Sequence, residues 1–212
     1  VKPEIDTDEI TNYEFGWKST LQDGRMVFNG AIFRSEYDDK QESILIPVNL
    51  ANVATVIRNA ASMEMNGLEL ELMYQVTEAW DLMVTYGYLE AEYKDYLADL
   101  TGDGVITDNS GLIPRNTPEN TFGITTSYTT QVGDGELKGR ISYRFRDEMN
   151  SDSSNNPLGD LDSIENVNAT INYSIDNYSI TIWGRNLTDE REQRWATIGG
   201  LTSRGWWNEP QT

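Results

Sequence analysis

The chain contains no cysteine and no histidine. Without cysteine, a disulfide framework, a thiolate nucleophile and a cysteine-ligated zinc site are all excluded. Without histidine, histidine-based serine triads, imidazole acid–base chemistry and histidine-ligated metals are excluded as well. Basic residues are also scarce, because 16 Lys and Arg stand against 35 Asp and Glu in 212 residues, a formal net charge of −19. This balance excludes a basic nucleic-acid-binding surface, and we expect no nucleic-acid partner.

Long apolar runs are missing too. The longest nearly apolar stretch, residues 44–57, is interrupted by Pro47, Asn49 and Asn52. A transmembrane helix needs about 18 or more apolar residues, so it is excluded. A transmembrane β-barrel stays compatible, since its strands alternate apolar and polar residues. The polar start at Val1 is no secretory signal, so we expect a mature chain, a cytoplasmic one or part of a longer protein.

Alternation of apolar and polar residues is the dominant pattern. In residues 137–146 one face takes Leu137, Gly139, Ile141, Tyr143 and Phe145, and the other takes Lys138, Arg140, Ser142, Arg144 and Arg146. A period of two predicts a strand and does not fit a helix. The same pattern, more or less regular, predicts eight strands in all, over residues 13–18, 25–37, 59–75, 81–93, 121–129, 137–146, 166–175 and 178–186.

Short and long connections alternate between these strands. The short ones are residues 22–24, 77–79, 131–136 and 176–177, and the long ones are 38–57, 96–118, 149–161 and 188–206. Membrane barrels combine short periplasmic turns with longer extracellular loops, so the long connections are expected on one acidic outer rim. Aromatic residues near the short turns would form an interfacial girdle, or pack the core of a soluble sandwich: Trp17, Tyr74, Trp80, Tyr128 and Tyr178.

Several segments, in order, resemble the C-terminal part of the barrel of TonB-dependent outer-membrane receptors. They include Asn12-Tyr13-Glu14-Phe15-Gly16-Trp17-Lys18, Asn66-Gly67-Leu68-Glu69-Leu70-Glu71 and Trp183-Gly184-Arg185-Asn186-Leu187-Thr188-Asp189-Glu190. The resemblance implies an all-β, antiparallel up-and-down meander that forms part of a 22-stranded transmembrane barrel. The predicted strands would be the fourteenth to twenty-first, and Trp206 would begin the last.

The resemblance also implies partners that this sequence does not contain. Residues 1–212 would be one barrel fragment without the plug domain or the last strand. Its partners would be outer-membrane lipid, its own N-terminal plug domain and, through that plug, the TonB-ExbB-ExbD complex. Charged residues of the barrel interior would pack against the plug or guide ligand, although a solvated sheet face is the simpler alternative: Glu69, Glu71, Lys138, Arg140, Arg144 and Arg146.

Residues 99–110 resemble a calcium loop of the EF-hand type. Asp99, Thr101 and Asp103 stand at positions 1, 3 and 5, Gly104 at 6 and Val105 at the backbone-carbonyl position 7. Position 12 is Ser110 instead of the usual bidentate Glu, which would weaken the site. An ordinary acidic glycine turn is the alternative. We expect no other cofactor.

Two further groups of residues bear on ligand binding and catalysis. Trp195, Trp206 and Trp207 would offer a stacking surface for a ligand, or serve as interfacial aromatic residues. The carboxylate pairs Asp38-Asp39 and Glu190/Glu192 would suit glycoside hydrolysis, but nothing sets them apart from ordinary loop acids. We therefore expect no enzyme activity.

The sequence thus favours the barrel wall of an outer-membrane receptor. Such a receptor imports a scarce, bulky nutrient (a siderophore, a vitamin or an oligosaccharide) with energy delivered by TonB. Two alternatives remain open at this stage. One is a small, complete outer-membrane barrel that acts as an adhesin or structural protein, and the other is a soluble calcium-binding β-sandwich lectin.

Overall fold

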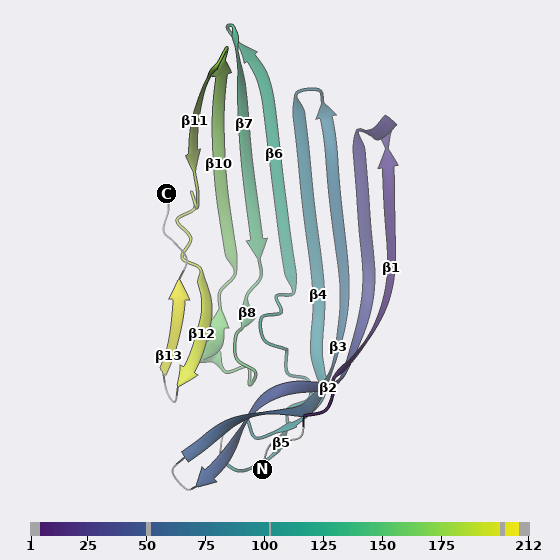
Figure 1. Ribbon diagram of the computed structural model, residues 1–212, viewed down its shortest axis with the longest axis vertical. Coiled ribbons are helices and arrows are strands. Elements are labelled where there is room, and N and C mark those ends of the chain that lie inside the picture. Colours follow the sequence, from purple (N-terminus) through teal and green to yellow (C-terminus); the bar gives the residue numbers. More distant parts are fainter. Residues whose placement is uncertain (1–4, 50–51, 102, 200–201, 208–212) are drawn as a thin grey trace.

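A computed structural model describes residues 5–49, 52–101, 103–199 and 202–207. Its main feature is a single antiparallel sheet in which each long strand pairs with its neighbours along the chain (Figure 1). The strand order is β1 (Glu9–Leu21), β2 (Met26–Asn49), β3 (Asn52–Thr77), β4 (Trp80–Ala98), β6 (Asn120–Val132), β7 (Gly135–Arg146), β10 (Ile164–Ile175) and β11 (Tyr178–Gly184). The predicted antiparallel meander is confirmed.

Short elements complete the described part of the chain. β5 (Thr107–Asp108) pairs with the end of β4, β8 (Met149–Asn150) with β9 (Asp160–Leu161), and β12 (Gln193–Gly199) with β13 (Thr202–Trp207). Helix is limited, in the described residues, to the 3₁₀ turns η1 (Gln22–Gly24) and η2 (Pro157–Gly159). No described helix is long and apolar enough to cross a membrane.

The connections sort onto two rims as expected. The short turns lie together at one end of the sheet, the turn rim, and the long connections lie at the other end, the outer rim (Figure 1). Tight turning requires left-handed backbone, which Asp23 (φ 55°) and Asp176 (φ 50°) supply on the turn rim.

Two predicted loops on the outer rim are wrong. Residues 38–49 and 52–57 are not a loop, because β2 and β3 continue as a paired extension in which Ile44 lies opposite Val56. β-branched residues favour extended backbone, which explains the continuation. Residues 188–206 contain the hairpin β12–β13, so Trp206 lies near the end of β13, opposite Trp195, and does not begin a barrel strand.

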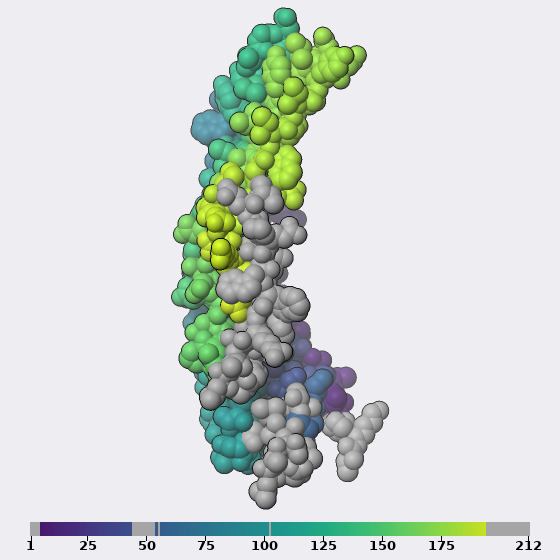
Figure 2. Space-filling view, turned by 90° about the vertical axis from the view of Figure 1, so that its left-hand side faces the viewer, coloured from purple at the N-terminus to yellow at the C-terminus, as the bar shows by residue number. Residues whose placement is uncertain are grey.

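The register gives the sheet one apolar and one polar face. Residues that pair directly share a face, and Phe15, Ile32, Leu68 and Tyr88 form one apolar row across β1–β4. The apolar face is open, since Phe15 keeps 66% and Ile182 keeps 70% of its surface exposed. The sheet is a single narrow layer when turned by 90° (Figure 2), so the expected girdle aromatics do not pack a sandwich core.

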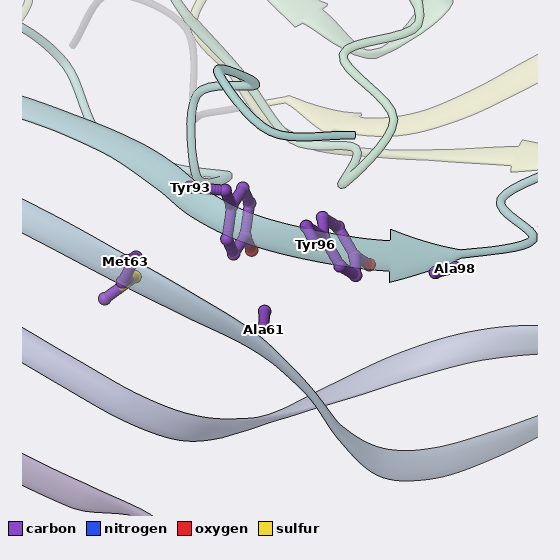
Figure 3. Close-up of a cluster of buried hydrophobic side chains, with 5 residues drawn as sticks. All are labelled: Ala61, Met63, Tyr93, Tyr96 and Ala98. Atoms are coloured by element: carbon purple, nitrogen blue, oxygen red, sulfur yellow. The ribbon is translucent and has the colours of Figure 1, made fainter. Parts of the chain in front are cut away.

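One small buried core lies near the outer rim. It consists of Ala61, Met63, Tyr93, Tyr96 and Ala98, where β3 and β4 extend beyond the strands that follow them (Figure 3). β4 pairs with β6 only between Trp80 and Tyr88, so these tyrosines project past the edge of β6. Loop residues, including Leu112, cover them instead.

Candidate functional site

The polar face carries the charged residues that the sequence singled out. Glu69 pairs with Gly87, Gly87 with Thr121, and Thr121 with Arg146, so an acid on β3 and a base on β7 share one row. The six predicted interior charges all lie on this face, because the register places the second row, Glu71–Thr85–Gly123–Arg144, beside the first and Lys138 and Arg140 further along β7.

The acidic and basic ends of each row are too far apart to touch. Strands are spaced by about 4.8 Å, so three steps from β3 to β7 separate the ends by about 14 Å. The acidic end has its own partner, since Asn29 Nδ2 donates to Glu71 Oε2 at 3.0 Å. At the basic end, Arg144 Nη2 lies 3.9 Å from Glu192 Oε2, and Arg146 Nη2 donates to the Asp162 carbonyl at 3.2 Å.

A strip of small residues separates the two charged ends. A Cβ at Gly87 would lie 2.7 Å from Thr121 Oγ1, and a Cβ at Gly123 would lie 2.7 Å from Thr85 Oγ1. The face is hollowed on both sides of this strip. One hollow of about 740 Å³ is lined by Glu14, Glu69 and Glu71 together with Lys18, and another of about 640 Å³ by Arg144 and Arg146 together with Glu192. The polar face therefore offers a mainly acidic and a mainly basic docking area on either side of a low, uncharged strip.

The acidic glycine loop forms a compact turn. Asp99 is buried, and its Oδ1 and Oδ2 accept from the backbone N–H groups of Thr101 (3.1 Å) and Gly104 (2.7 Å). Asp103 Oδ1 accepts from Val105 N at 2.8 Å, and Gly104 takes φ 87°. In the described residues no three Asp or Glu side chains converge into a metal-binding group. The calcium loop stays a prediction.

The three predicted ligand-stacking tryptophans lie in the β12–β13 hairpin. Their backbones are close, with Trp195 opposite Trp206 and Gln193 opposite Trp207. Their side chains lie outside the part of the chain that the structure describes. A role of Trp195, Trp206 and Trp207 in ligand contact stays a prediction.

The segment Asn186–Glu190 has a structural role that sequence reasoning missed. Asn186 is buried at φ 52°; its Oδ1 accepts from Glu190 N at 2.9 Å and its Nδ2 donates to the Glu190 carbonyl at 2.9 Å. Thr188 Oγ1 donates to the Glu165 carbonyl at 2.9 Å, which fastens the same turn to β10. The segment therefore ends β11 and turns the chain away from the sheet. Asn followed by Thr and Asp is a turn-forming signal that could have identified it.

A buried ionic cluster on the outer rim was also missed. Glu42 is 1% exposed, forms an ion pair with Lys40, and accepts a 2.6 Å hydrogen bond from the Tyr93 hydroxyl. Burial, with the neighbouring Tyr96, raises the pKa of Tyr93 to about 12. Burial and the neighbouring Arg115 lower the pKa of Lys40. Glu42, Tyr93 and Arg115 are distant from one another in sequence, so no local pattern indicates the cluster.

The family follows from comparison with known proteins. The family model described as "TonB dependent receptor-like, beta-barrel" matches residues 3–187. The chain belongs to this family. Members are outer-membrane β-barrels, so the outer membrane is the location of this chain, and their role is transport, not catalysis.

Individual relatives agree with the family. The probable TonB-dependent siderophore receptor PiuA of Acinetobacter baumannii is 26% identical over 195 residues, 88% of this chain and 24% of PiuA. The crystal structure of PiuA matches 98% of this chain, and the match takes up 28% of the PiuA chain. The TM-score is 0.77 and the sequence identity is 22%. The crystal structure of the ferric yersiniabactin uptake receptor FyuA of Yersinia pestis matches with a TM-score of 0.76 and 16% identity. This match covers 96% of this chain and 28% of FyuA.

The matched relatives are much longer than this chain. The chain spans about a quarter of the length of PiuA, the first of these relatives. The two structural matches are under 25% identical and therefore support the fold alone.

Proposed function

We propose that this chain is a wall segment of a larger TonB-dependent receptor that imports a ferric siderophore. Its relatives support this substrate class, since PiuA is named a probable siderophore receptor and FyuA a ferric yersiniabactin uptake receptor. Import would draw its energy from TonB acting through a plug domain. No bond chemistry is part of the proposal.

The observation that carries the proposal is the division of charge on the polar face. Glu69 and Glu71 on β3 face the same space as Arg144 and Arg146 on β7, but about 14 Å separates them across the uncharged strip. A third body with a basic patch and an acidic patch would satisfy both ends at once. A plug domain inside the barrel is such a body, so plug packing is the role proposed for these residues.

The edges of the sheet support the larger assembly. Within the described residues β1 pairs only with β2, and β11 pairs only with β10. An open strand edge in lipid leaves backbone groups without hydrogen bonds, which costs several kcal/mol for each group. Further strands of the same barrel would close both edges and leave the apolar face against lipid.

Uptake of labelled iron tests this function. The complete receptor is expressed in a Gram-negative host that lacks its own siderophore receptors, and a panel of ferric siderophores is supplied. We expect import of at least one chelate, abolished by deletion of tonB while cell-surface binding of that chelate persists. Absence of uptake for the whole panel would overturn the substrate class, and uptake without TonB would overturn the energy coupling.

A further inference from the structure

Arg115 lies between two separate attachments of its own segment. On one side, Ile113 N donates to Asn155 Oδ1 at 2.9 Å, and Asn155 Nδ2 donates to the Ile113 carbonyl at 2.8 Å. On the other side, Asn116 N donates to the Asn150 carbonyl at 2.8 Å. The connection between β7 and β10 therefore holds the backbone around Arg115 at both flanks.

The same segment is also fixed to β4. Tyr93 N donates to the Leu112 carbonyl at 3.0 Å, and Gly111 N donates to the Tyr93 carbonyl at 2.8 Å. Asn116 takes φ 59°, a left-handed conformation that asparagine tolerates better than most residues. The backbone that carries Arg115 is thus positioned by two different parts of the outer rim.

The Arg115 side chain is aimed at the buried ionic cluster but is not fully engaged with it. Arg115 Nη2 lies 4.0 Å from Glu42 Oε2, at the limit of an ion pair, and the Arg115 side chain is 50% exposed. Glu42 Oε2 is buried and has no hydrogen-bond partner in the described residues. Lys40 and Tyr93 both donate hydrogen bonds to the other carboxylate oxygen of Glu42, Oε1. A buried carboxylate oxygen without a donor is costly, so a small advance of the guanidinium would be favoured.

We propose that Arg115 is a latch on the outer rim. When its guanidinium closes onto Glu42 Oε2, it joins the β2–β3 extension, the 109–118 segment and the β7–β10 connection into one rigid lid. When it withdraws, Glu42 keeps only its bonds to Lys40 and Tyr93, so the β2–β3 extension is tied to the other two less tightly, through Tyr93 alone. The contact requires neither nutrient nor plug, so the inference stands apart from the substrate proposed above.

The described chain has no cysteine of its own, so two introduced cysteines carry the spin labels once any cysteine elsewhere in the complete receptor is replaced by serine. Ser43→Cys on β2 and Leu158→Cys in η2, both exposed, report the separation of the two sides. In the complete receptor without ligand we expect a single narrow distance distribution. Arg115→Ala should broaden it at least twofold, and Glu42→Gln should broaden it as well.

Controls separate the latch from general damage. Arg191→Ala removes an exposed positive charge from the connection between β11 and β12 and should leave the distribution narrow. Heat-modifiable migration on gels verifies that each variant forms its barrel, and Arg115→Gln, which keeps a long side chain without the charge, covers the case in which Arg115→Ala fails to fold. A folded Arg115→Ala or Arg115→Gln receptor with an unchanged distribution would overturn the latch. Broadening in Arg191→Ala to the same extent would overturn it too.

Discussion

Trp17 on β1 lies directly over Gly30 on β2, so closely that a Cβ at Gly30 would fall 2.1 Å from Trp17 Cζ2. The two residues pair in the register and share the apolar face, where an aromatic ring covers the backbone that glycine leaves open. The same arrangement recurs on the polar face, where Phe33 lies over Gly67. The ring at Trp17 thus depends on the absence of a side chain at Gly30.

Gly30→Ala should therefore displace Trp17 and destabilise the barrel. Overpacking of this kind costs about 1–3 kcal/mol. Gly139→Ala is a matched control on the same face, because nothing lies within 4 Å of a Cβ there. Thermal unfolding in detergent, followed by gel mobility, measures both. Equal midpoints for Gly30→Ala and wild type would show that the ring moves aside without cost.

Charge reversal on the polar face should loosen the plug of the proposed receptor. Arg144→Glu and Glu71→Lys each place a like charge against a complementary plug surface, so we expect a leakier pore, measured as increased entry of a large antibiotic or higher single-channel conductance. Because about 14 Å separates the two positions, they do not compensate each other and their effects should add. Recovery of a closed pore in the double variant would indicate direct pairing of Glu71 with Arg144 and would contradict the plug interpretation.

The Tyr93 hydroxyl should lose its proton at a higher pH than an ordinary tyrosine does. Its folded-state pKa of about 12 lies above the ordinary value of 10, so the folded receptor holds this proton more tightly than the unfolded chain does. The resulting stabilisation is fully present below pH 10 and is lost as the pH rises from 10 to 12, where ionisation removes the hydrogen bond to Glu42. The ultraviolet absorbance of ionised phenol should show a transition near pH 12 that Tyr93→Phe removes.

Arg115, which lies near Tyr93, gives a second check on the titration of Tyr93. Arg115 lowers the pKa of Tyr93, so Arg115→Ala should move the transition to still higher pH. Tyr178→Phe, at an exposed position of the apolar face, should leave it in place. If the transition that Tyr93→Phe removes were centred near pH 10 and not near pH 12, burial of Tyr93 would be contradicted.

Alternation was sufficient to predict the eight long strands and the sorting of their connections. It was sufficient because each spanning strand separates lipid from the polar interior residue by residue, as Ile141 and Arg140 do. The sequence was less informative at the outer rim. There Glu42, Tyr93 and Arg115 meet through contacts between segments about 20 to 70 residues apart, and no local period encodes such contacts.

Asn186 should contribute to stability more than its place in a loop suggests. Asn186→Ala removes the bonds to both backbone groups of Glu190 and strains the backbone at φ 52°. We expect a loss of about 1–3 kcal/mol. Asn186→Gly keeps the backbone conformation and loses only the side-chain bonds, so it should be milder. Asn177→Ala, at an exposed position of the short β10–β11 turn, should have little effect. If the three variants had the same free energy of unfolding in urea, the turn would have no structural role.

Calcium should protect the loop at residues 99–110. Asp99, Thr101 and Asp103 offer oxygens at spacings that suit the ion, while Val105 and Ile106 are exposed for 58% and 71% of their surface and are open to protease. Without a bidentate Glu at the last position, binding should be weak, with a dissociation constant of about 0.1–1 mM. A calcium concentration of about 2 mM lies above this range of dissociation constants and should fill the site. In intact cells, protease should therefore cut residues 96–118 several-fold more slowly with this calcium than with a chelator.

Two controls decide between the metal site and the simple acidic turn. Asp103→Asn should abolish the protection, because a neutral amide binds the ion weakly while its oxygen still accepts from Val105 N. Asp134→Asn on the turn rim should change nothing, and residues 131–136 should stay uncut in intact cells if, as the loop lengths predict, they face the periplasm. Cleavage that is equally fast with calcium and with chelator would favour the acidic turn. Cleavage at residues 131–136 with residues 96–118 protected would reverse the orientation and, with it, the assignment of the long connections to the cell surface.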